Sequence, residues 1–372
     1  MQRLTPLLVG VLLTWLTPTM AQTPDYIIQS NTAPLKLLGQ PASKPAVPAA
    51  APREASAAVA KPQPAVGRVR IGLLLPTGSA TLGEAAAVVR SGVEAAASVD
   101  QNAELVTIDA SEDTAVAGYK QALAGGVNVV IGPLSRGAIA AVAPLVSVPT
   151  LALNSIGREV PANPKLFSLS LTVEGEARQV ARLMREDGRV NPLLLFGGDS
   201  LSQRLRQAFI DEWRVQNRGK SPMLLEAKPD SLPAILQAAA GADAVFMALD
   251  AREAGIVKAA LAPELAVYGT SQLNGRGSAA ALAGARVIDM PWFLMPEHPA
   301  VRRYPRPSMP LTMQTERLYA LGVDAWRLAV LLAGARQPLG LKLDGVTGDL
   351  KLGRDRLFER QLPMAVLSSE QQ

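Results

Sequence analysis

Apolar and polar positions follow a regular pattern from residue 68 onward. A run of branched apolar residues that ends at Pro76 is typical of a strand buried on both faces of a parallel sheet. A helix-period pattern follows, and the two patterns then alternate with short turns between them. Such alternation predicts an open, mostly parallel sheet with helices on both faces. Further strands are predicted at 105–109, 127–131 and 150–153, and helices at 82–97, 113–124 and 135–145.

The alternation breaks over 157–170 and then restarts. The second series predicts strands at 192–196, 223–227, 244–248 and 266–269, and helices at 175–186, 200–217, 232–239, 251–262 and 278–283. Each series covers roughly 100 residues, close to the usual size of a domain, so we expect an α/β protein with two lobes. The remaining segments must complete these lobes: a strand at 287–290, a proline-rich loop at 291–310, a helix at 312–333 and a hairpin-like tail at 345–367.

The first 67 residues do not share this pattern. Residues 1–21 carry one positive charge, an apolar run and small residues before position 22, which predicts a cleaved signal peptide and export from the cytoplasm. An uncleaved anchor is the alternative, although the run is about half of the ~20 residues that a spanning helix requires. Over 22–67, alanine and proline predict an extended linker without helix or strand pairing. The linker is either a tether through the envelope or low-complexity padding.

Composition excludes several classes of site. Zero cysteines exclude disulfides, thiolate metal sites, cysteine nucleophiles and a lipid anchor on cysteine. The single histidine, His298, excludes any site that needs two imidazoles. A net charge of +5 without a basic stripe gives no indication of nucleic-acid binding. Because neither an HExxH motif nor a calcium-loop spacing is present, we expect no metal and no cofactor.

The sequence gives only weak evidence for a catalytic site. The turn at 78–83 has the glycine spacing of a phosphate-binding loop, but Glu84 and Ala85 follow where lysine and a hydroxyl residue are needed. It is either a backbone anion site or a turn that requires glycine. His298 lies between prolines, a poor position for a general base, and the chain has no GxSxG elbow. Asp109, Asp199 and Asp250 follow strands and could form a carboxylate pair in one cleft, but caps of the following helices explain Asp199 and Asp250 without any chemistry. We therefore expect no enzyme.

Ligands of open α/β sheets bind outside the carboxyl ends of the strands. Polar residues at these ends are the candidates for a small carboxylate ligand in the cleft between the lobes: Ser79, Ser135, Asn154, Ser155, Asp199, Asp250, Ser271 and Gln272. The alternative is that they cap helices in a cleft that binds nothing specific.

Two segments of the proline-rich loop are candidates for contact with a protein partner. Trp292 and Phe293 lie in an unusually apolar stretch, which either packs between the lobes or contacts a partner. Arg302 and Arg303 begin a basic, extended run that is either a solvated loop or faces an acidic surface.

Motifs along nearly all of 68–367 resemble known proteins. The segments VRIGLLLPTGSATLGEAAAVVRSGVEAA, VVIGPLSRGAIAAVAPL and PTLALNS are similar to the first lobe of the type I periplasmic-binding-protein fold. A closer resemblance is to the penicillin-binding-protein activator family of Gram-negative envelopes. It rests on LSLTVEGEARQVARLM, AVYGTSQLN, VIDMPWFL, ALGVDAWRLA and GVTGDLKLGRDRLFERQLPMAVL.

The resemblance implies a non-catalytic periplasmic regulator that binds and activates a bifunctional class A penicillin-binding protein in peptidoglycan synthesis. It also implies lobe 1 at about 68–168 and 291–340, lobe 2 at about 169–290 and 341–367, a tail at 368–372, and crossings near 166–170, 287–294 and 340–347. Enterobacterial members begin with a lipidated cysteine and a helical-repeat domain, which this sequence lacks, so outer-membrane anchoring is not implied. The alternative is a solute-binding receptor of an ABC importer for a small amino acid or cell-wall fragment, although few aromatic residues lie near the turns.

Overall fold

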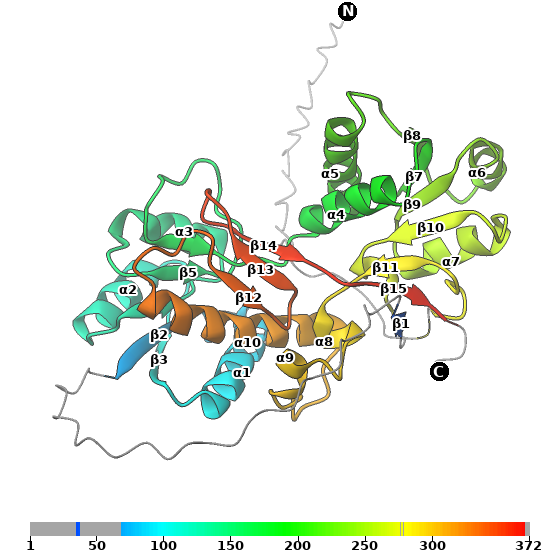
Figure 1. Cartoon of the computed structure of the whole chain (residues 1–372). Coiled ribbons are helices and arrows are strands. Elements are labelled where there is room, and N and C mark those ends of the chain that lie inside the picture. Colours follow the sequence, from blue (N-terminus) through cyan, green and yellow to red (C-terminus); the bar gives the residue numbers. More distant parts are fainter. Residues whose placement is uncertain (1–34, 38–67, 276, 278, 369–372) are drawn as a thin grey trace, which may run out of the picture.

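The computed structural model describes residues 35–37, 68–275, 277 and 279–368. These residues form two α/β lobes that lie side by side (Figure 1). Lobe 1 is built on a parallel sheet with the strand order β3-β2-β4-β5-β6. Its strands are β2 (Val69–Leu75), β3 (Ala103–Asp109), β4 (Val129–Ile131), β5 (Thr150–Ala152) and β6 (Leu166–Ser168).

Helices cover both faces of the lobe 1 sheet. Successive residues of β2 point to opposite faces, so Ile71 and Leu73 pack beneath α1 and α10 while Leu74 packs beneath α2 and α3. The apolar run at 68–75 is therefore buried on both sides, as a strand in the middle of a parallel sheet must be. The helices are α1 (Gly83–Val99), α2 (Ala115–Ala124), α3 (Arg136–Val142), the 3₁₀ turn η1 (Ala143–Leu145) and α10 (Met313–Gly334).

Lobe 2 contains a second sheet with the order β1-β15-β11-β10-β9-β7-β8. The strands β11, β10, β9, β7 and β8 are parallel to one another. At one edge β15 pairs antiparallel with β11, and β1 pairs antiparallel with β15. These strands are β1 (Leu35–Leu37), β7 (Pro192–Phe196), β8 (Met223–Glu226), β9 (Ala244–Ala248), β10 (Ala266–Gly269), β11 (Arg286–Ile288) and β15 (Met364–Leu367).

The lobe 2 sheet is also covered on both faces. Leu194 and Phe246 pack with α4 and α5 on one face, while Leu193 and Val245 pack with α6 and α7 on the other. The helices are α4 (Val173–Glu186), α5 (Ser200–Gln216), α6 (Leu232–Ala239) and α7 (Ala251–Ala260), followed by the 3₁₀ turn η2 (Ser271–Leu273). The predicted fold class, two lobes that each carry a mostly parallel sheet between helices, is confirmed.

Two local predictions differ from the structure. The predicted helix at 278–283 is wrong, because its described residues form turns that end at Gly284, whose φ is +83°. The predicted loop at 291–310 contains two short helices, α8 (Pro291–Leu294) and α9 (Pro299–Arg302). Proline at the first position of each helix explains this difference, because its missing N–H and its fixed φ are favourable there.

The predicted tail divides between the lobes. β12 (Lys342–Asp344), β13 (Asp349–Leu352) and β14 (Phe358–Gln361) form a separate antiparallel sheet. Its buried residues Leu350, Leu352 and Phe358 belong to the core of lobe 1, and only β15 continues into lobe 2. The assignment of 341–367 to lobe 2 is therefore wrong for β12–β14, and the third crossing lies at Leu362 and Pro363 rather than near 340–347. Amphipathic strands do not specify which core receives their apolar face.

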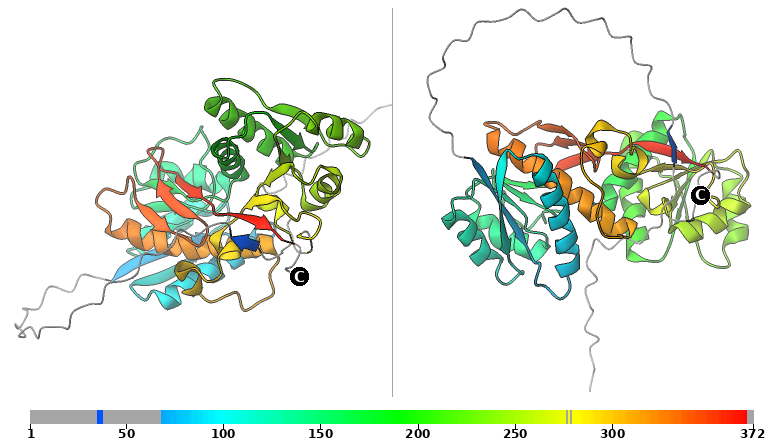
Figure 2. Two further views of the ribbon diagram at one scale, coloured as in Figure 1. Left: turned by 45° about the vertical axis from the view of Figure 1, so that its right-hand side comes forward. Right: turned by 90° about the horizontal axis from the view of Figure 1, so that it is seen from below.

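The linker prediction also needs one correction. Residues Leu35–Leu37 form strand β1, which pairs antiparallel with β15 in the order Leu35 to Leu367, Lys36 to Val366 and Leu37 to Ala365 (Figure 2). The expectation of no strand pairing over 22–67 is wrong here, because these three residues contain no proline and lie against a sheet edge. The predicted signal peptide, the rest of the linker and most of the tail at 368–372 lie outside the described residues.

Candidate functional site

Within the described residues, three segments of chain connect the lobes. β6 ends at Ser168 in lobe 1, and α4 begins at Val173 in the core of lobe 2. β11 ends at Ile288 in lobe 2, and Trp292 already belongs to the core of lobe 1. The third connection runs through Leu362, between β14 and β15. Polar side chains gather around these connections.

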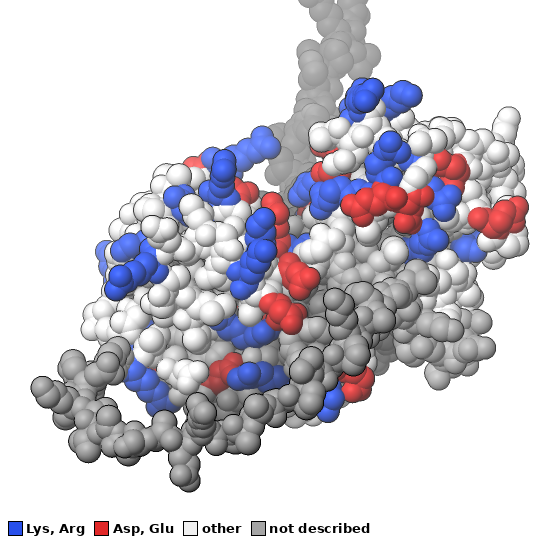
Figure 3. Space-filling model, viewed as in Figure 1, with Lys and Arg blue, Asp and Glu red and all other residues white. Residues whose placement is uncertain are grey.

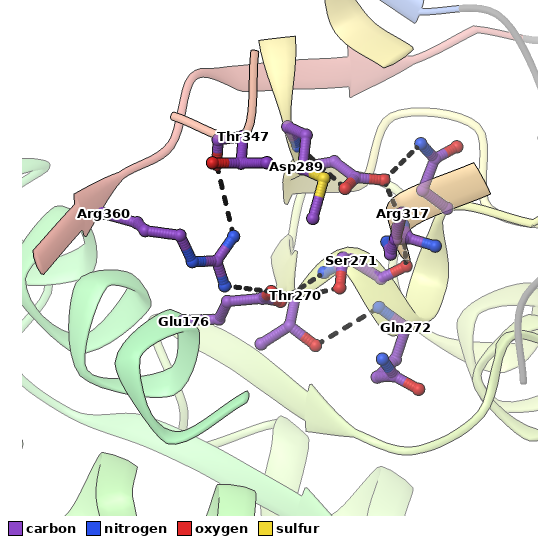
Figure 4. A network of polar contacts seen from close by, with 10 residues as sticks. Glu176, Thr270, Ser271, Gln272, Asp289, Arg317, Thr347 and Arg360 are labelled. Atoms are coloured by element: carbon purple, nitrogen blue, oxygen red, sulfur yellow. Dashed lines mark hydrogen bonds and ion pairs between the residues drawn. The ribbon is translucent and has the colours of Figure 1, made fainter. Parts of the chain in front are cut away.

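Glu176, in the first turn of α4, lies at the centre of a buried polar network (Figure 4). Its Oε2 accepts hydrogen bonds from the backbone N–H of Ser271 at 3.1 Å and from the Ser271 hydroxyl at 2.7 Å. Its Oε1 lies 3.4 Å from Nη2 of Arg360 on β14. Arg360 also donates from Nη1 to the carbonyl oxygen of Thr347 at 3.2 Å. This ion pair therefore joins α4 of lobe 2 to the small sheet of lobe 1.

A second buried ion pair joins Asp289, which follows β11, to Arg317 of α10. The side chains are 1% and 5% exposed. Asp289 also accepts hydrogen bonds from Nδ2 of Asn274 and from the N–H of Met290, both at 2.8 Å. The Arg317 guanidinium lies 4.9 Å from the ring centroid of Phe293. This pair ties the second connection to the long helix of lobe 1.

Gln179 of α4 holds the third connection. Its Nε2 donates to the carbonyl oxygen of Leu362 at 2.6 Å, and its Oε1 accepts from the N–H of Leu362 at 2.9 Å. The Gln179 side chain is buried. It therefore pairs with Leu362 as a neighbouring strand would, at the point where the chain leaves one lobe for the other.

Asp324 of α10 holds the turn between β12 and β13. Its carboxylate accepts hydrogen bonds from the N–H groups of Val346 and Thr347 at 3.1 and 2.8 Å, and from the Thr347 hydroxyl at 2.7 Å. Arg327 donates to the same carboxylate at 2.9 Å. Burial raises the pKa of Asp324, and Arg327 counteracts this effect.

Burial shifts both partners of the Glu176–Arg360 pair. Loss of water raises the pKa of the Glu176 carboxyl and lowers the pKa of the Arg360 guanidinium, because burial disfavours the charged form of each. The opposite charge of Arg360 and the hydrogen bond from Ser271 counteract the effect on Glu176. Each partner thus depends on the other, and removing one would leave an uncompensated buried group.

A small cavity lies between the lobes beside this network. Leu134 and Asn154 of lobe 1, Thr172 and Ser271 of lobe 2, and Arg317 are among its lining residues. Its volume is about 40 Å³, which accommodates a few water molecules at about 10–15 Å³ each. Sites for small organic ligands measure about 300–1,000 Å³. In this arrangement of the lobes the cavity is too small for an amino acid.

Several predicted cleft residues begin helices instead of lining the cavity. Ser135, Asp199 and Asp250 are the N-caps of α3, α5 and α7, where they accept N–H bonds from residues three positions later at 3.1, 2.9 and 2.8 Å. The Ser79 hydroxyl accepts the N–H of Leu82 at 3.3 Å, just before α1. Capping, the alternative weighed for these positions, accounts for Ser135, Asp199 and Asp250, whereas Ser79 bonds within the turn that precedes α1.

Of the other four candidates, two line the cavity. Asn154 and Ser271 line it, and Ser271 is bonded to Glu176. The Ser155 hydroxyl accepts from Nε of Arg136 at 3.2 Å, and the Gln272 N–H donates to the Thr270 hydroxyl at 3.4 Å. Ligand binding by the predicted residues stays a prediction.

Sequence reasoning missed the ionic residues Glu176, Asp289, Arg317 and Arg360 as candidates. One signal was available for the first of them. Glu176 lies on the face of α4 that carries Val173 and Val180, so a charged residue occupies the apolar side of an amphipathic helix. A carboxylate in that position requires a buried partner.

The predicted partner residues have different environments. Trp292 is 0% exposed, and its Nε1 donates to Glu316 at 2.8 Å, so the prediction that it contacts a partner directly is wrong. Phe293 is partly buried against the same core. Arg302 and Arg303 are exposed and pair with Glu297 and Asp100. For these residues partner contact stays a prediction.

Tyr304, next to Arg303, gives a testable pH dependence. Its hydroxyl donates to Asp100 at 2.8 Å, and burial together with this hydrogen bond raises the pKa of Tyr304 to about 12. The unfolded phenol has a pKa of about 10, so the associated stability is complete below about pH 10 and is lost as the pH rises through about 12. Urea unfolding from about pH 9 to about pH 12 should show a steeper loss for the wild type than for Tyr304→Phe. Parallel curves would contradict this assignment.

His298 caps the short helix α9, and its Nε2 lies 3.8 Å from Asp344. Nδ1 of His298 accepts the N–H of Ala300 at 3.3 Å at the start of α9. Among the described residues, no group of three or more His, Asp or Glu side chains is arranged to hold a metal ion. None of the described helices has both the length and the apolar character needed to cross a membrane.

Comparison with known families identifies the relationship. The sequence matches the family described as "LppC putative lipoprotein" over residues 40–230 and 231–366. The chain belongs to the LppC family of penicillin-binding-protein activators. The resemblance inferred from the motifs is therefore confirmed.

Curated LppC relatives are longer proteins. Penicillin-binding protein activator LpoA of Edwardsiella ictaluri is 27% identical over 293 residues, which cover 65% of this chain and 42% of the relative. LpoA of Haemophilus influenzae is 27% identical over 256 residues, or 65% of this chain and 44% of the relative. The chain thus spans less than half the length of these two relatives.

Solved structures include a more similar protein. One from Chromobacterium violaceum, described as "a putative branched-chain amino acid ABC transporter", is 65% identical, covers 80% of this chain and 99% of its own, and has a TM-score of 0.78. The LpoA C-domain from Haemophilus influenzae, described as a regulator of PBP1A, is 25% identical, covers 81% of this chain and 98% of its own, and has a TM-score of 0.68. Both share the two-lobed fold.

Proposed function

We propose that this protein is a non-catalytic periplasmic regulator that binds and activates a class A penicillin-binding protein. Membership of the LppC family supports a role in activating a penicillin-binding protein, and the solved LpoA C-domain is described as a regulator of PBP1A. The composition of residues 1–21 supports export to the periplasm.

The observation that carries the proposal is the small volume of the cavity lined by Asn154 and Ser271 between the lobes. A solute receptor closes around its ligand by a hinge motion, so its two lobes must separate and leave room for the solute. Here the Glu176–Arg360 pair joins the lobes, and the cavity beside it measures about 40 Å³. This arrangement supports a protein that presents its outer surface to a partner.

The local roles of the polar side chains support the absence of catalysis. Asp199 and Asp250, the carboxylates that follow strands of lobe 2, each accept a backbone N–H of the next helix. His298 accepts a backbone N–H rather than facing a nucleophile. These groups act in helix formation, as capping residues do.

A reconstituted synthesis assay tests the proposal. Adding the purified chain to a class A penicillin-binding protein from the same organism should raise peptidoglycan cross-linking and should retain the synthase in a pull-down. The double variant Ser79→Ala, Asn154→Ala should raise cross-linking within about twofold of the wild type. The reason is that the Ser79 hydroxyl accepts the N–H of Leu82 and the Asn154 amide donates to the carbonyl oxygen of Leu134. No retention and no rise in cross-linking would overturn the proposal.

The second candidate is a solute receptor for an amino-acid importer. It is favoured by the description of the Chromobacterium violaceum protein, which is 65% identical. Calorimetric titration with leucine, isoleucine and valine separates the two candidates. Saturable heat that is lost in the Ser79→Ala, Asn154→Ala variant would establish the receptor, whereas the regulator should give no saturable heat.

A further inference from the structure

A groove that adjoins the interlobe cavity, with which it shares Ser170, Thr172 and Glu176, is lined by residues of both lobes. It lies between α4 and the β13–β14 hairpin, and its volume is about 520 Å³, within the range of about 300–1,000 Å³ for small-ligand sites. On the face shown in Figure 3, acidic and basic side chains lie on both sides of the boundary between the lobes. The charged groups of its two walls are Arg178 and Arg182 on α4, and Asp349, Lys351, Asp355 and Glu359 on the hairpin side.

The two walls have opposite net charge. Two guanidinium groups project from α4, whereas the hairpin side carries three carboxylates and one ammonium group. Lys351 lies opposite Glu359 in the register of β13 and β14, so the charges of these two side chains partly cancel. Arg182 lies 3.3 Å from Glu212 of α5. Arg178 interacts electrostatically with Glu174, whose carboxylate is already paired with Arg204. Within the described part of the chain, Asp349 forms no ion pair.

The two charged side chains at the floor of the groove neutralise each other. They form the buried Glu176–Arg360 pair and are 5% and 6% exposed. Ser170 and Thr172, on the first connection between the lobes, add hydroxyl groups at one edge. The groove therefore offers a cation on one wall, an anion on the other and hydrogen-bonding groups between them.

We propose that this groove binds a short peptide with a free amino and a free carboxyl terminus. The carboxylate would pair with the guanidinium of Arg178, which binds carboxylates with two parallel hydrogen bonds. The terminal ammonium group would face Asp349. Because α4 belongs to lobe 2 and the hairpin to lobe 1, an occupant of the groove contacts both lobes and favours the arrangement in which the walls are this close. The site goes beyond the activation of a synthase and does not depend on it.

Calorimetric titration of the full chain with alanine peptides of two to five residues tests this site. The matched probes are the same peptides with an acetylated amino terminus or an amidated carboxyl terminus. We expect the free peptides to give saturable heat and each blocked form to bind at least about tenfold more weakly, because each block removes one charge-assisted contact. Arg178→Gln should remove the discrimination against the amidated peptide, and Asp349→Asn that against the acetylated one.

Matched variants separate this site from a general effect of charge. Arg185→Gln and Glu186→Gln change exposed charges in the last turn of the same helix, away from the groove, and should bind like the wild type. Substitutions at exposed positions leave the fold intact, which thermal unfolding monitors. The absence of saturable heat with every free peptide, equal affinity for free and blocked peptides, or unchanged binding by Arg178→Gln and Asp349→Asn would each overturn the proposal.

Discussion

Replacing Arg317 with methionine is expected to lower the free energy of unfolding by about 3–5 kcal/mol, the usual cost of removing one partner of a buried ion pair. The change leaves the Asp289 carboxylate, 1% exposed, without its cation. It also removes the guanidinium that packs on Phe293. Urea unfolding followed by circular dichroism measures the change.

Two further variants establish that the cost comes from the uncompensated charge. The double change Arg317→Met, Asp289→Asn should recover part of the loss, because no buried charge remains and the amide oxygen of the asparagine still accepts a hydrogen bond in place of the carboxylate. Arg90→Ala removes a partner of the exposed pair with Glu94, whose side chains are 45% and 46% exposed, and should cost less than about 1 kcal/mol. Equal losses in Arg317→Met and Arg90→Ala would contradict the assignment.

Gly322→Ala is expected to lower the free energy of unfolding by about 3 kcal/mol, at the upper end of the usual cost of overpacking. α1 and α10 approach each other closely at two glycines. A Cβ at Gly322 would lie 2.1 Å from the carbonyl oxygen of Val89, and a Cβ at Gly92 would lie 2.0 Å from the carbonyl oxygen of Tyr319. These neighbours are backbone atoms of packed helices, so the helices themselves would have to move apart.

Gly334, the last residue of α10, provides the matched control. A Cβ there would meet nothing within 4 Å, so Gly334→Ala should leave stability unchanged or raise it by up to about 1 kcal/mol through helix propensity. Thermal and urea unfolding of both variants give the comparison. If the two substitutions had the same effect, close helix contact would not be the reason for glycine at position 322.

Helix α4 shows how far a local pattern predicts the structure. Its period predicted a helix at 175–186, and the structure has Val173–Glu186. Its apolar face also contained Glu176 and Gln179, but the partners of these side chains, Arg360 and Leu362, are more than 180 residues away. A local pattern shows which face of a helix is buried and not what it is buried against.

The sequence alone determined the alternation of strands and helices, the two-lobed fold class and the family, because these depend on local periodicity and on motifs that are continuous in the chain. It also offered capping as one account of Asp199 and Asp250, since a cap bonds to residues three positions away. Only the tertiary structure decided that β12–β14 pack on lobe 1, that β1 joins the edge of lobe 2, and that buried ion pairs occupy the space between the lobes. The physical reason is that the partner of a buried face or charge is a residue that it meets only after folding, so the choice of partner leaves no periodic trace in the sequence.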